Sequence, residues 1–321
     1  MSNFIFYHND PDGIMACAVM LYDKRNIEYI DSEHRYKNSI AINYNDNLSK
    51  DKFIKVLINE LNGKHIYLLD YTFTEEQVQY LANIVRQYNI KLTGITIIDH
   101  HKLDYDSYIE NLADVLLPIE YRGRIYKFID TNHSGCFLTW QYKYKDLSKY
   151  PPHKAVLLVE DYDIWKWEYK ETNDFVTGII PLEINDYVAI LRNLLPVKEV
   201  VYYGRIVDRY KQKLAERFFK DKKISDFILK ELNIGNEKYT IILINKIVES
   251  LKHSQLVLQN KFGDRYLYAF YTILPDGVTI SFRGKGALKV ARYFYGGGHP
   301  EAAGCKIDLK DFISIFLKRY L

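Results

Sequence analysis

Four short apolar runs in the first half of the chain are each followed at once by carboxylates or imidazoles. The runs occupy residues 4–7, 66–69, 95–98 and 155–160. The groups that follow them are, in order, His8, Asp10 and Asp12; Asp70; Asp99, His100 and His101; and Asp161. The carboxyl ends of parallel strands lie on one edge of a sheet, and ligands bind at that edge in open α/β folds. We therefore expect these side chains to line one cleft of a parallel α/β sheet.

Strand and helix signals alternate over residues 3–160. Short β-branched or aromatic runs predict strands at 3–7, 27–31, 65–69 and 93–98. Pro11 suits a first helical position, residues 50–61 have helical spacing, and Thr74 is expected to cap a helix that runs to about residue 89. Residues 134–144 are expected to be helical, and residues 153–160 helical or partly a strand. This alternation is typical of a doubly wound parallel sheet.

A change of pattern near residue 181 predicts three segments. Residues 1–181 form the parallel-sheet domain, and residues 182–234 a helical connector, because residues 186–233 show no clear strand. Strand signals return at 239–245, 266–274 and 278–283, and helices are expected at 247–259, 287–295 and 310–320. Residues 235–321 are therefore expected to form a second, smaller α/β domain.

Composition excludes several classes of protein. The chain has 321 residues, of which 48% are hydrophobic and 26% charged, as in ordinary globular proteins. A net charge of +3 is too small for a wide surface that binds long duplex nucleic acid, although it allows a small anionic ligand. Cys17, Cys136 and Cys305 lack metal-site spacing and are expected to be reduced, apolar residues. No apolar run long enough to span a bilayer and no signal-peptide pattern is present, so a cytoplasmic location is expected.

The predicted cleft gathers at least five carboxylates and up to three imidazoles. Like charges a few ångström apart repel, so the pKa values of the carboxyls rise unless a counter-charge binds. Oxygen and imidazole ligands suit Mn²⁺ or Mg²⁺, with Fe²⁺ or Co²⁺ as alternatives, and the lack of thiolates argues against structural zinc. Two such ions, about 3.5–4 Å apart, activate water and clamp phosphoryl oxygens. The pattern predicts hydrolysis of a phosphate ester or anhydride.

A glycine run beside a histidine marks the second half of the chain. Gly297 and Gly298 precede His299, and Pro300 is expected to begin a helix. Glycines let backbone N–H groups approach a phosphate, and a helix start favours an anion, although a plain turn is the alternative. Arg283 ends a predicted strand and can make a bidentate phosphate contact.

Five motifs, in order, resemble those of the DHH phosphoesterases that carry a second domain called DHHA1. They are HNDPDG at 8–13, LLD at 68–70, DHH at 99–101, VED at 159–161 and GGGHPEAAG at 296–304. Within that superfamily the chain looks most like the compact oligoribonuclease (nanoRNase-like) and phosphodiesterase members. The resemblance implies a DHH metal-binding catalytic domain at 1–181 and a DHHA1 substrate-binding domain at 235–321.

The resemblance also implies two metal sites and their ligands. The implied ligands are His8 and Asp10 for the first ion, Asp12, His100 and Asp161 for the second, and Asp70 as a bridge between them. Residues 161–167 read DYDIWKW, so Asp163 is an alternative to Asp161. Trp165 and Trp167 in the same stretch are expected to pack in the core or at its rim rather than to stack on bases.

Roles in catalysis and substrate binding follow from the same resemblance. Asp70 is implied to be catalytic, Asp99 to orient an imidazole, and His101 to face the substrate phosphate or protonate the leaving group. The substrate's nucleotide phosphates are implied to contact Arg283, Gly297, Gly298 and His299. Lys285 is expected to be solvated.

The resulting hypothesis is an Mn²⁺-dependent phosphodiesterase with two bound ions, for which Mg²⁺ or Co²⁺ are alternatives. It would hydrolyse short oligonucleotides or dinucleotides to nucleoside 5′-monophosphates. The alternatives are a 3′-phosphoadenosine 5′-phosphate phosphatase, a cyclic-dinucleotide phosphodiesterase, and a nucleotide-sensing binding module without turnover. RNA and DNA substrates, either direction of attack, and a homodimer stay open at this point.

Overall fold

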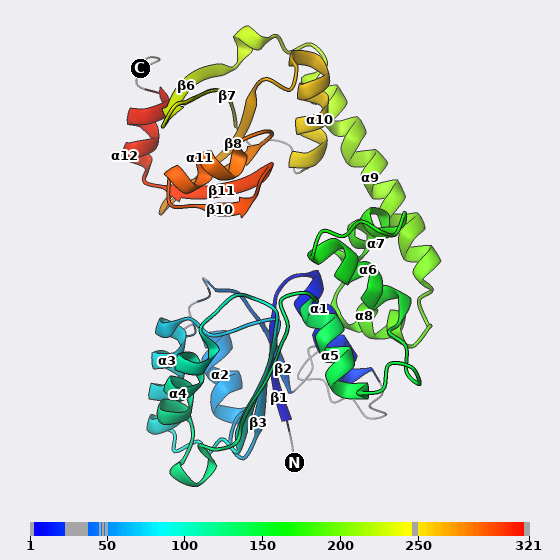
Figure 1. The fold of residues 1–321 in the computed structure, drawn as a ribbon, viewed down its shortest axis with the longest axis vertical. Coiled ribbons are helices and arrows are strands. Elements are labelled where there is room, and N and C mark those ends of the chain that lie inside the picture. Colours follow the sequence, from blue (N-terminus) through cyan, green and yellow to red (C-terminus); the bar gives the residue numbers. More distant parts are fainter. Residues whose placement is uncertain are drawn as a thin grey trace. The chain divides into compact units, whose positions relative to one another are not determined.

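The structure, a computed structural model, describes residues 3–22, 38–44, 46, 48, 51–245 and 250–317. The chain divides into two compact units, Met1–Val207 and Asp208–Leu321, and each is built on its own sheet (Figure 1). The strand expected at 27–31 lies outside the described residues. The segment predicted as a connector is divided between the units, because the long helix α9 (Val197–Phe219) crosses the boundary.

The first unit contains a five-stranded sheet in the order β2-β1-β3-β4-β5. Its strands are β1 (Asn3–His8), β2 (Ser39–Ile42), β3 (His65–Leu69), β4 (Gly94–Asp99) and β5 (Ile125–Ile129). All four pairings are parallel, so the carboxyl ends of the strands share one edge. The predicted parallel sheet is therefore confirmed, and β5 is a strand that the sequence did not indicate.

Helices cover both faces of this sheet (Figure 1). The helical elements of this unit before α9 are α1 (Pro11–Leu21), α2 (Asp51–Glu60), α3 (Glu75–Gln87), α4 (Tyr105–Leu116), η1 (Ile119–Tyr121), α5 (Gly135–Tyr144), α6 (Lys154–Asp163), α7 (Thr172–Ile179) and α8 (Ile184–Leu191). Strand β1 shows why two cores form. Phe4 and Phe6 pack against α2, α3 and α4, whereas Ile5 and Tyr7 join the core that contains α1, α5 and α6.

Two helices begin where local chemistry predicts. Asp10 caps α1 through the amide of Gly13 at 2.9 Å, and Pro11 occupies the first turn. Thr74 caps α3 in a reciprocal capping box with Gln77. The cap on α1 also places Asp10 and Asp12 at the carboxyl end of β1.

The structure of the fourth apolar run, residues 155–160, differs from the sequence-based interpretation, which grouped it with the strands. Residues 154–163 form helix α6, so Asp161 lies in a helix and does not follow a strand. Val156 and Val159 of this run are fully buried in the core shared with α1 and α5. A short apolar run is compatible with a buried strand or a buried helix, and periodicity alone does not separate the two.

The second unit contains a six-stranded mixed sheet in the order β10-β11-β9-β8-β7-β6. Its elements after α9 are η2 (Ile224–Asp226), β6 (Ile228–Ile234), β7 (Glu237–Asn245), α10 (Leu251–Phe262), β8 (Leu267–Leu274), β9 (Gly277–Arg283), α11 (Ala287–Tyr293), β10 (Gly297–His299), β11 (Ala302–Ile307), α12 (Leu309–Phe312) and the π-helix η3 (Ile313–Leu317). Only β7 and β8 pair in parallel among the described strands of this sheet. The expected smaller C-terminal α/β domain is confirmed.

Two expectations for this unit are wrong. Residues 228–234 were expected to be helical, but they form β6, which pairs with β7 around a turn at Gly235. Half-buried and exposed residues alternate along β6, as they do in a strand with one covered face. Pro300 does not begin a helix, because the glycine run enters the antiparallel hairpin β10–β11.

None of the helices that the described residues form combines the length and apolar character needed to cross a membrane. Cys17 and Cys136 are buried as expected, and Cys305 is half-buried.

Candidate metal centre

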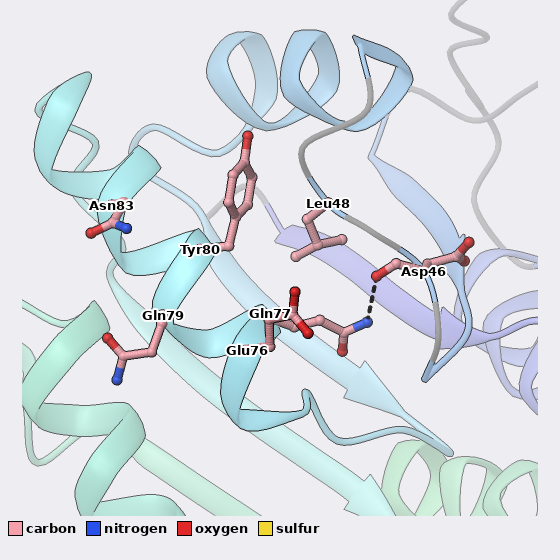
Figure 2. Close-up of a pocket in the computed structure, with 7 residues that line it drawn as sticks. All are labelled: Asp46, Leu48, Glu76, Gln77, Gln79, Tyr80 and Asn83. Atoms are coloured by element: carbon pink, nitrogen blue, oxygen red, sulfur yellow. Dashed lines mark hydrogen bonds between the residues drawn. The ribbon is translucent and has the colours of Figure 1, made fainter. Parts of the chain in front are cut away.

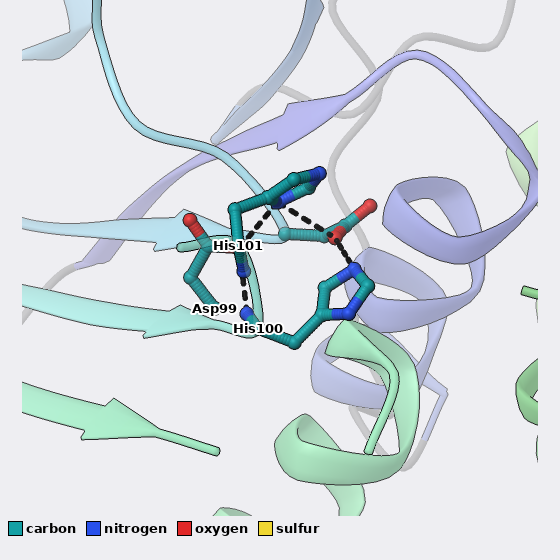
Figure 3. A group of neighbouring side chains, drawn as sticks. Asp99, His100 and His101 are labelled. Atoms are coloured by element: carbon teal, nitrogen blue, oxygen red, sulfur yellow. Dashed lines mark hydrogen bonds and ion pairs between the residues drawn. The ribbon is translucent and has the colours of Figure 1, made fainter. Parts of the chain in front are cut away.

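Strands β1, β3 and β4 lie side by side in the first sheet, and their carboxyl ends bring the predicted groups together. His8 is the last residue of β1, Asp70 follows β3, and Asp99 is the last residue of β4. Figure 3 shows Asp99, His100 and His101 gathered at the end of β4. The sheet edge therefore concentrates imidazole and carboxylate groups in one place.

Three groups of potential metal ligands lie at this edge among the described residues, and one of them, Asp70, Asp99, His100 and His101, contains the hydrogen-bonded pair Asp99 and His101. The other two lie on either side of Asp70. In the first group His8 Nδ1 lies 2.8 Å from Asp10 Oδ2 and 3.7 Å from Asp70 Oδ2. In the second group His100 Nε2 lies 3.4 Å from Asp163 Oδ2 and 4.0 Å from Asp12 Oδ2.

The same His100 nitrogen lies 3.2 Å from Asp70 Oδ1. One oxygen of Asp70 thus faces each group, which is the arrangement that a bridging carboxylate requires. In both groups the ligand atoms lie within 4.8 Å of one another.

The backbone at Asp70 is unusual. Its φ is 53°, in the left-handed region that aspartate adopts more readily than most residues. The amide of Asp70 still donates to Ile98 O at 2.8 Å, which continues the ladder between β3 and β4. This conformation turns the side chain at the end of β3, where the residue is 1% exposed.

The start of helix α5 holds Asp12 in the site. The amides of Gly135 and Cys136 donate to its two carboxylate oxygens at 2.6 and 2.9 Å, as helix N-termini do for anions. A side chain at Gly135 would bring its Cβ to 2.5 Å from the Cβ of Asp70. Glycine is therefore required at this position, and no motif in the sequence indicated it.

Burial and mutual repulsion govern the electrostatics of the cluster. Burial, and then the charge of Asp12, raises the pKa of Asp70 well above its ordinary value. Burial, with the charges of Asp12 and Asp70, raises the pKa of Asp163 to about 9. Burial alone would lower the pKa of His8, but the neighbouring carboxylates of Asp10 and Asp70 outweigh it and raise that pKa to about 10.

The donor set fits a divalent cation. Asp70 Oδ1 and Asp163 Oδ2 are buried, and neither receives a hydrogen bond within the part of the chain that the structure describes. Buried polar atoms are rarely left without a partner unless an ion or water serves them. Carboxylate oxygens that converge with imidazole nitrogens suit hard or borderline divalent ions.

Asp99 is engaged differently from the other carboxylates. Its Oδ1 accepts from His101 Nδ1 at 2.8 Å and its Oδ2 from the Tyr105 hydroxyl at 2.9 Å. Burial opposes the effect, but these hydrogen bonds hold the pKa of Asp99 below its ordinary value. The bond to Asp99 in turn raises the pKa of His101, whose side chain is 43% exposed. Asp99 thus orients an accessible, readily protonated imidazole.

Asp161 and Asp163 have different partners and therefore different roles. The carboxylate of Asp161 accepts from Glu168 N at 2.7 Å, from Tyr169 N at 3.3 Å and from the Thr172 hydroxyl. Asp161 is therefore occupied with the turn that follows α6, and it does not join the ligand groups. The structure places Asp163 beside His100 instead, because side chains two residues apart on a helix face different sides.

Tyr44 borders the centre and was missed by the sequence analysis. Its ring centroid lies 5.3 Å from that of His8 and 6.2 Å from that of His101, and the ring stacks on Tyr71 at 4.9 Å. Burial, and then the charges of Asp99 and Asp70, raise the pKa of Tyr44, so its hydroxyl stays neutral. No spacing in the sequence links this tyrosine to the motifs.

The loop that carries Tyr44 is clamped by Gln77. The side-chain amide of Gln77 donates to Asn43 O and to Asp46 O, each at 3.0 Å. Figure 2 shows the bond to Asp46. Gln77 also lines a pocket of about 240 Å³, together with Asp46, Leu48, Glu76, Gln79, Tyr80 and Asn83. The pocket contains none of the predicted site residues.

The second unit brings Arg283 and His299 to one face of its sheet. Both residues pair with Ala302, Arg283 from β9 and His299 from β10, so they lie two strand spacings apart, about 10 Å. Gly298 has a φ of 133°, and a Cβ there would lie 2.6 Å from the Cα of Ala303. The hairpin therefore requires this glycine, whereas a Cβ on Gly297 would meet nothing within 4 Å.

Comparisons with known proteins address the fold. No family model matches the chain. An uncharacterized protein of Acanthamoeba polyphaga mimivirus is 21% identical over 255 residues, and the alignment covers 77% of this chain. It covers 54% of that protein, so the chain spans about half the length of this curated relative.

Among solved structures, the DHH domain of a protein described as a member of a family of ribosomal proteins aligns with 99% of this chain and 86% of its own. The two are 15% identical, with a TM-score of 0.55. The chain has a DHH-type fold. A pGpG-specific phosphodiesterase of Vibrio cholerae aligns over 98% of this chain and 96% of its own, at 11% identity and a TM-score of 0.45.

In the DHH fold of this chain, the first three motifs occupy the ends of β1, β3 and β4, as the sequence predicted. The fourth motif occupies α6 and contributes Asp163 to the cluster. The resemblance found in the sequence and the fold found in the structure therefore agree on the architecture.

Proposed function

We propose that this DHH-fold chain is a metal-dependent phosphodiesterase with two bound Mn²⁺ ions. It hydrolyses short oligonucleotides or dinucleotides and releases nucleoside 5′-monophosphates. The observation that carries the proposal is the position of Asp70, whose two oxygens face two separate ligand groups. A single structural ion would not need a buried carboxylate between two such groups.

The residues of each group would hold one ion. His8, Asp10 and Asp70 form the first set. Asp12, His100 and Asp163 form the second set, with Asp70 shared. Two bound divalent ions supply Lewis acidity and a water of lowered pKa, which is the chemistry of in-line phosphoryl displacement.

His101 supplies proton chemistry from the protein itself. Because Asp99 accepts from Nδ1, the other ring nitrogen of His101 is free to face a substrate phosphate or the leaving oxygen. The raised pKa of His101 favours the protonated ring, which can donate to that oxygen. Tyr105, which also donates to Asp99, fixes the carboxylate that positions the imidazole.

The second unit would recognise the rest of the substrate. Arg283 and His299 share a sheet face next to a hairpin whose glycine admits close backbone approach. Arginine binds phosphate oxygens in a bidentate manner, and an exposed histidine adds a further donor. The small net charge supports a ligand with few phosphates.

A panel of substrates tests the proposal. Oligonucleotides of two to twenty residues, labelled at the 5′ or the 3′ end, are incubated with the protein and Mn²⁺. A nucleotide 3′,5′-bisphosphate and a cyclic dinucleotide are included. We expect monophosphates from the shortest oligomers, with turnover falling as length rises. Preferred cleavage of the bisphosphate or of the cyclic dinucleotide would assign the alternative substrates.

Matched variants make the test specific. Asp70→Asn should lower kcat by about a thousandfold, because it removes the charge shared by both sets. Asp276→Asn removes an exposed acid in the turn between β8 and β9, which pairs only with Lys306 among the partners found within the described residues, and should leave kcat unchanged. Absence of any monophosphate in Mn²⁺, or an active Asp70→Asn variant, would overturn the proposal. Tight nucleotide binding without turnover would favour a sensing module.

A further inference from the structure

Two tryptophans are displayed on the surface of the first unit directly after α6. Trp165 is 49% exposed and Trp167 is 44% exposed, so neither packs in the core, and of the two positions that the sequence suggested only the rim of the core remains. Their rings meet edge to face with centroids 5.8 Å apart, and Tyr162 meets Trp167 at 5.5 Å. The three side chains form one exposed aromatic cluster, which we call the tryptophan turn.

The backbone of the tryptophan turn is strained. Trp165 has a φ of 59° and Trp167 a φ of 57°, in the left-handed region that bulky residues rarely adopt. Glycine or asparagine would satisfy such positions at lower cost. Strain of this kind persists only where the surroundings over-determine it, and it concentrates at functional sites.

Asp161 provides that constraint. Its buried carboxylate accepts from the amides of Glu168 and Tyr169, and its carbonyl accepts from Lys166 N at 3.0 Å and Trp167 N at 3.4 Å. The Lys154 ammonium lies 3.4 Å from the centroid of the Tyr169 ring and so holds the C-terminal end of the segment 164–169. A fully buried acid is thus dedicated to holding two indoles outward in a fixed conformation.

The tryptophan turn lies next to the metal centre. Asp163, whose Oδ2 is 3.4 Å from His100 Nε2, precedes Trp165 by two residues. Two residues span at most about 7 Å, so the Cα atom of Trp165 lies within about 7 Å of the Cα atom of Asp163. Lys166 between the two indoles pairs with Glu160 at 3.5 Å, so the turn offers aromatic faces rather than an additional phosphate contact.

We propose that Trp165 and Trp167 form a nucleobase subsite that stacks on a base of the nucleotide whose phosphate occupies the metal centre. This inference rests on the proposed function and names the part of the substrate that the first unit reads. Stacking on aromatic side chains tolerates every base, because each base has a π-face. Rigid aromatic side chains lose little conformational entropy on binding, which suits a turn already fixed by Asp161.

Fluorescence tests the subsite without any need for turnover. Adenosine 5′-monophosphate is titrated into the protein while tryptophan emission is recorded. Trp140, the remaining tryptophan, is 6% exposed and out of reach of a ligand in solvent. We expect quenching in the wild type, less quenching in Trp165→Ala and in Trp167→Ala, and retained nucleotide affinity in the corresponding Phe variants. If both Ala variants showed the same quenching and the same nucleotide affinity as the wild type, the proposal would be overturned.

Kinetics provide the second readout. Each Ala variant should raise the KM for a dinucleotide by about tenfold, or about 1.4 kcal/mol, and change kcat by less than about twofold. An abasic phosphodiester of the same length should show no change, because it has no base to stack. Tyr202→Ala is the matched control, because it removes one ring of the exposed Tyr202–Tyr203 pair on α9. It should behave as wild type.

The two proposals fail in different ways. Quenching by adenosine 5′-monophosphate without hydrolysis of any substrate would leave the subsite standing and remove the phosphodiesterase. If the protein hydrolysed dinucleotides and both Ala variants kept the wild-type KM, the phosphodiesterase would stand and the nucleobase subsite would be removed.

Discussion

The cluster at the strand ends of the first unit and the glycine–histidine hairpin of the second unit are built in opposite ways. Asp12, Asp70 and Asp99 are at most 1% exposed, and backbone amides or neighbouring side chains engage Asp12 and Asp99. His299 lies on an exposed three-residue strand, and Gly298 is required there by the backbone alone.

The two regions differ in how strongly their charged groups are shielded by solvent. The buried cluster contains Asp70 and Asp163, whose pKa values rise through burial and repulsion, so these two carboxyls favour the binding of positive charge. The hairpin surface keeps its groups near solvent, where each contact to a phosphate contributes less. We therefore expect substitutions in the first region to act on catalysis and metal affinity, and those in the second to act on substrate binding.

Separate substitutions of the two acids of α6, Asp161 and Asp163, should give the largest difference in effect. Asp163→Asn should weaken Mn²⁺ binding by about a hundredfold while the fold remains stable, because a repelled carboxylate is neutralised. Asp161→Asn should keep Mn²⁺ affinity but lower the free energy of unfolding by about 1–3 kcal/mol, because it disturbs three hydrogen bonds to a buried acid. Calorimetric Mn²⁺ titration and urea denaturation measure the two effects. The opposite assignment of effects would return the ligand role to Asp161.

Gly135→Ala should act next most strongly. The added Cβ would meet Asp70 and displace the amides that hold Asp12. We expect a loss of about 1–3 kcal/mol in stability, together with weaker Mn²⁺ binding. Gly123→Ala is the control, since a Cβ there would meet nothing within 4 Å. Unchanged Mn²⁺ affinity in Gly135→Ala would show that the start of α5 does not shape the centre.

Arg283→Ala should give the smallest effect. We expect the KM for a dinucleotide to rise about tenfold, with kcat nearly unchanged, because the contact is made equally in the ground and transition states. Steady-state kinetics against Lys285→Ala, an exposed lysine two residues away, measure it. If Arg283→Ala left both KM and kcat at wild-type values, the substrate-binding role of the second unit would be wrong.

Local patterns in the sequence were sufficient for much of the site. His8, Asp70 and Asp99 were placed correctly at strand ends because a short apolar run followed by a polar residue is a local signal. Asp163 could not be separated from Asp161, because that choice depends on whether residues 154–163 are a helix and on which side of it faces His100. The helical expectation for residues 228–234 failed because β6 is decided by its pairing with β7.

Residue pattern alone predicted β1, β3 and β4 of the first unit, the order of the motifs and the kind of chemistry that their side chains can perform. These properties follow from periodicity and residue type, which neighbouring positions set. Three features became visible only in the folded chain: Asp70 faces two ligand groups, Gly135 must lack a side chain, and Arg283 and His299 share a face. Each of these depends on packing or strand register between segments far apart in the chain, and such contacts form only when the whole fold does.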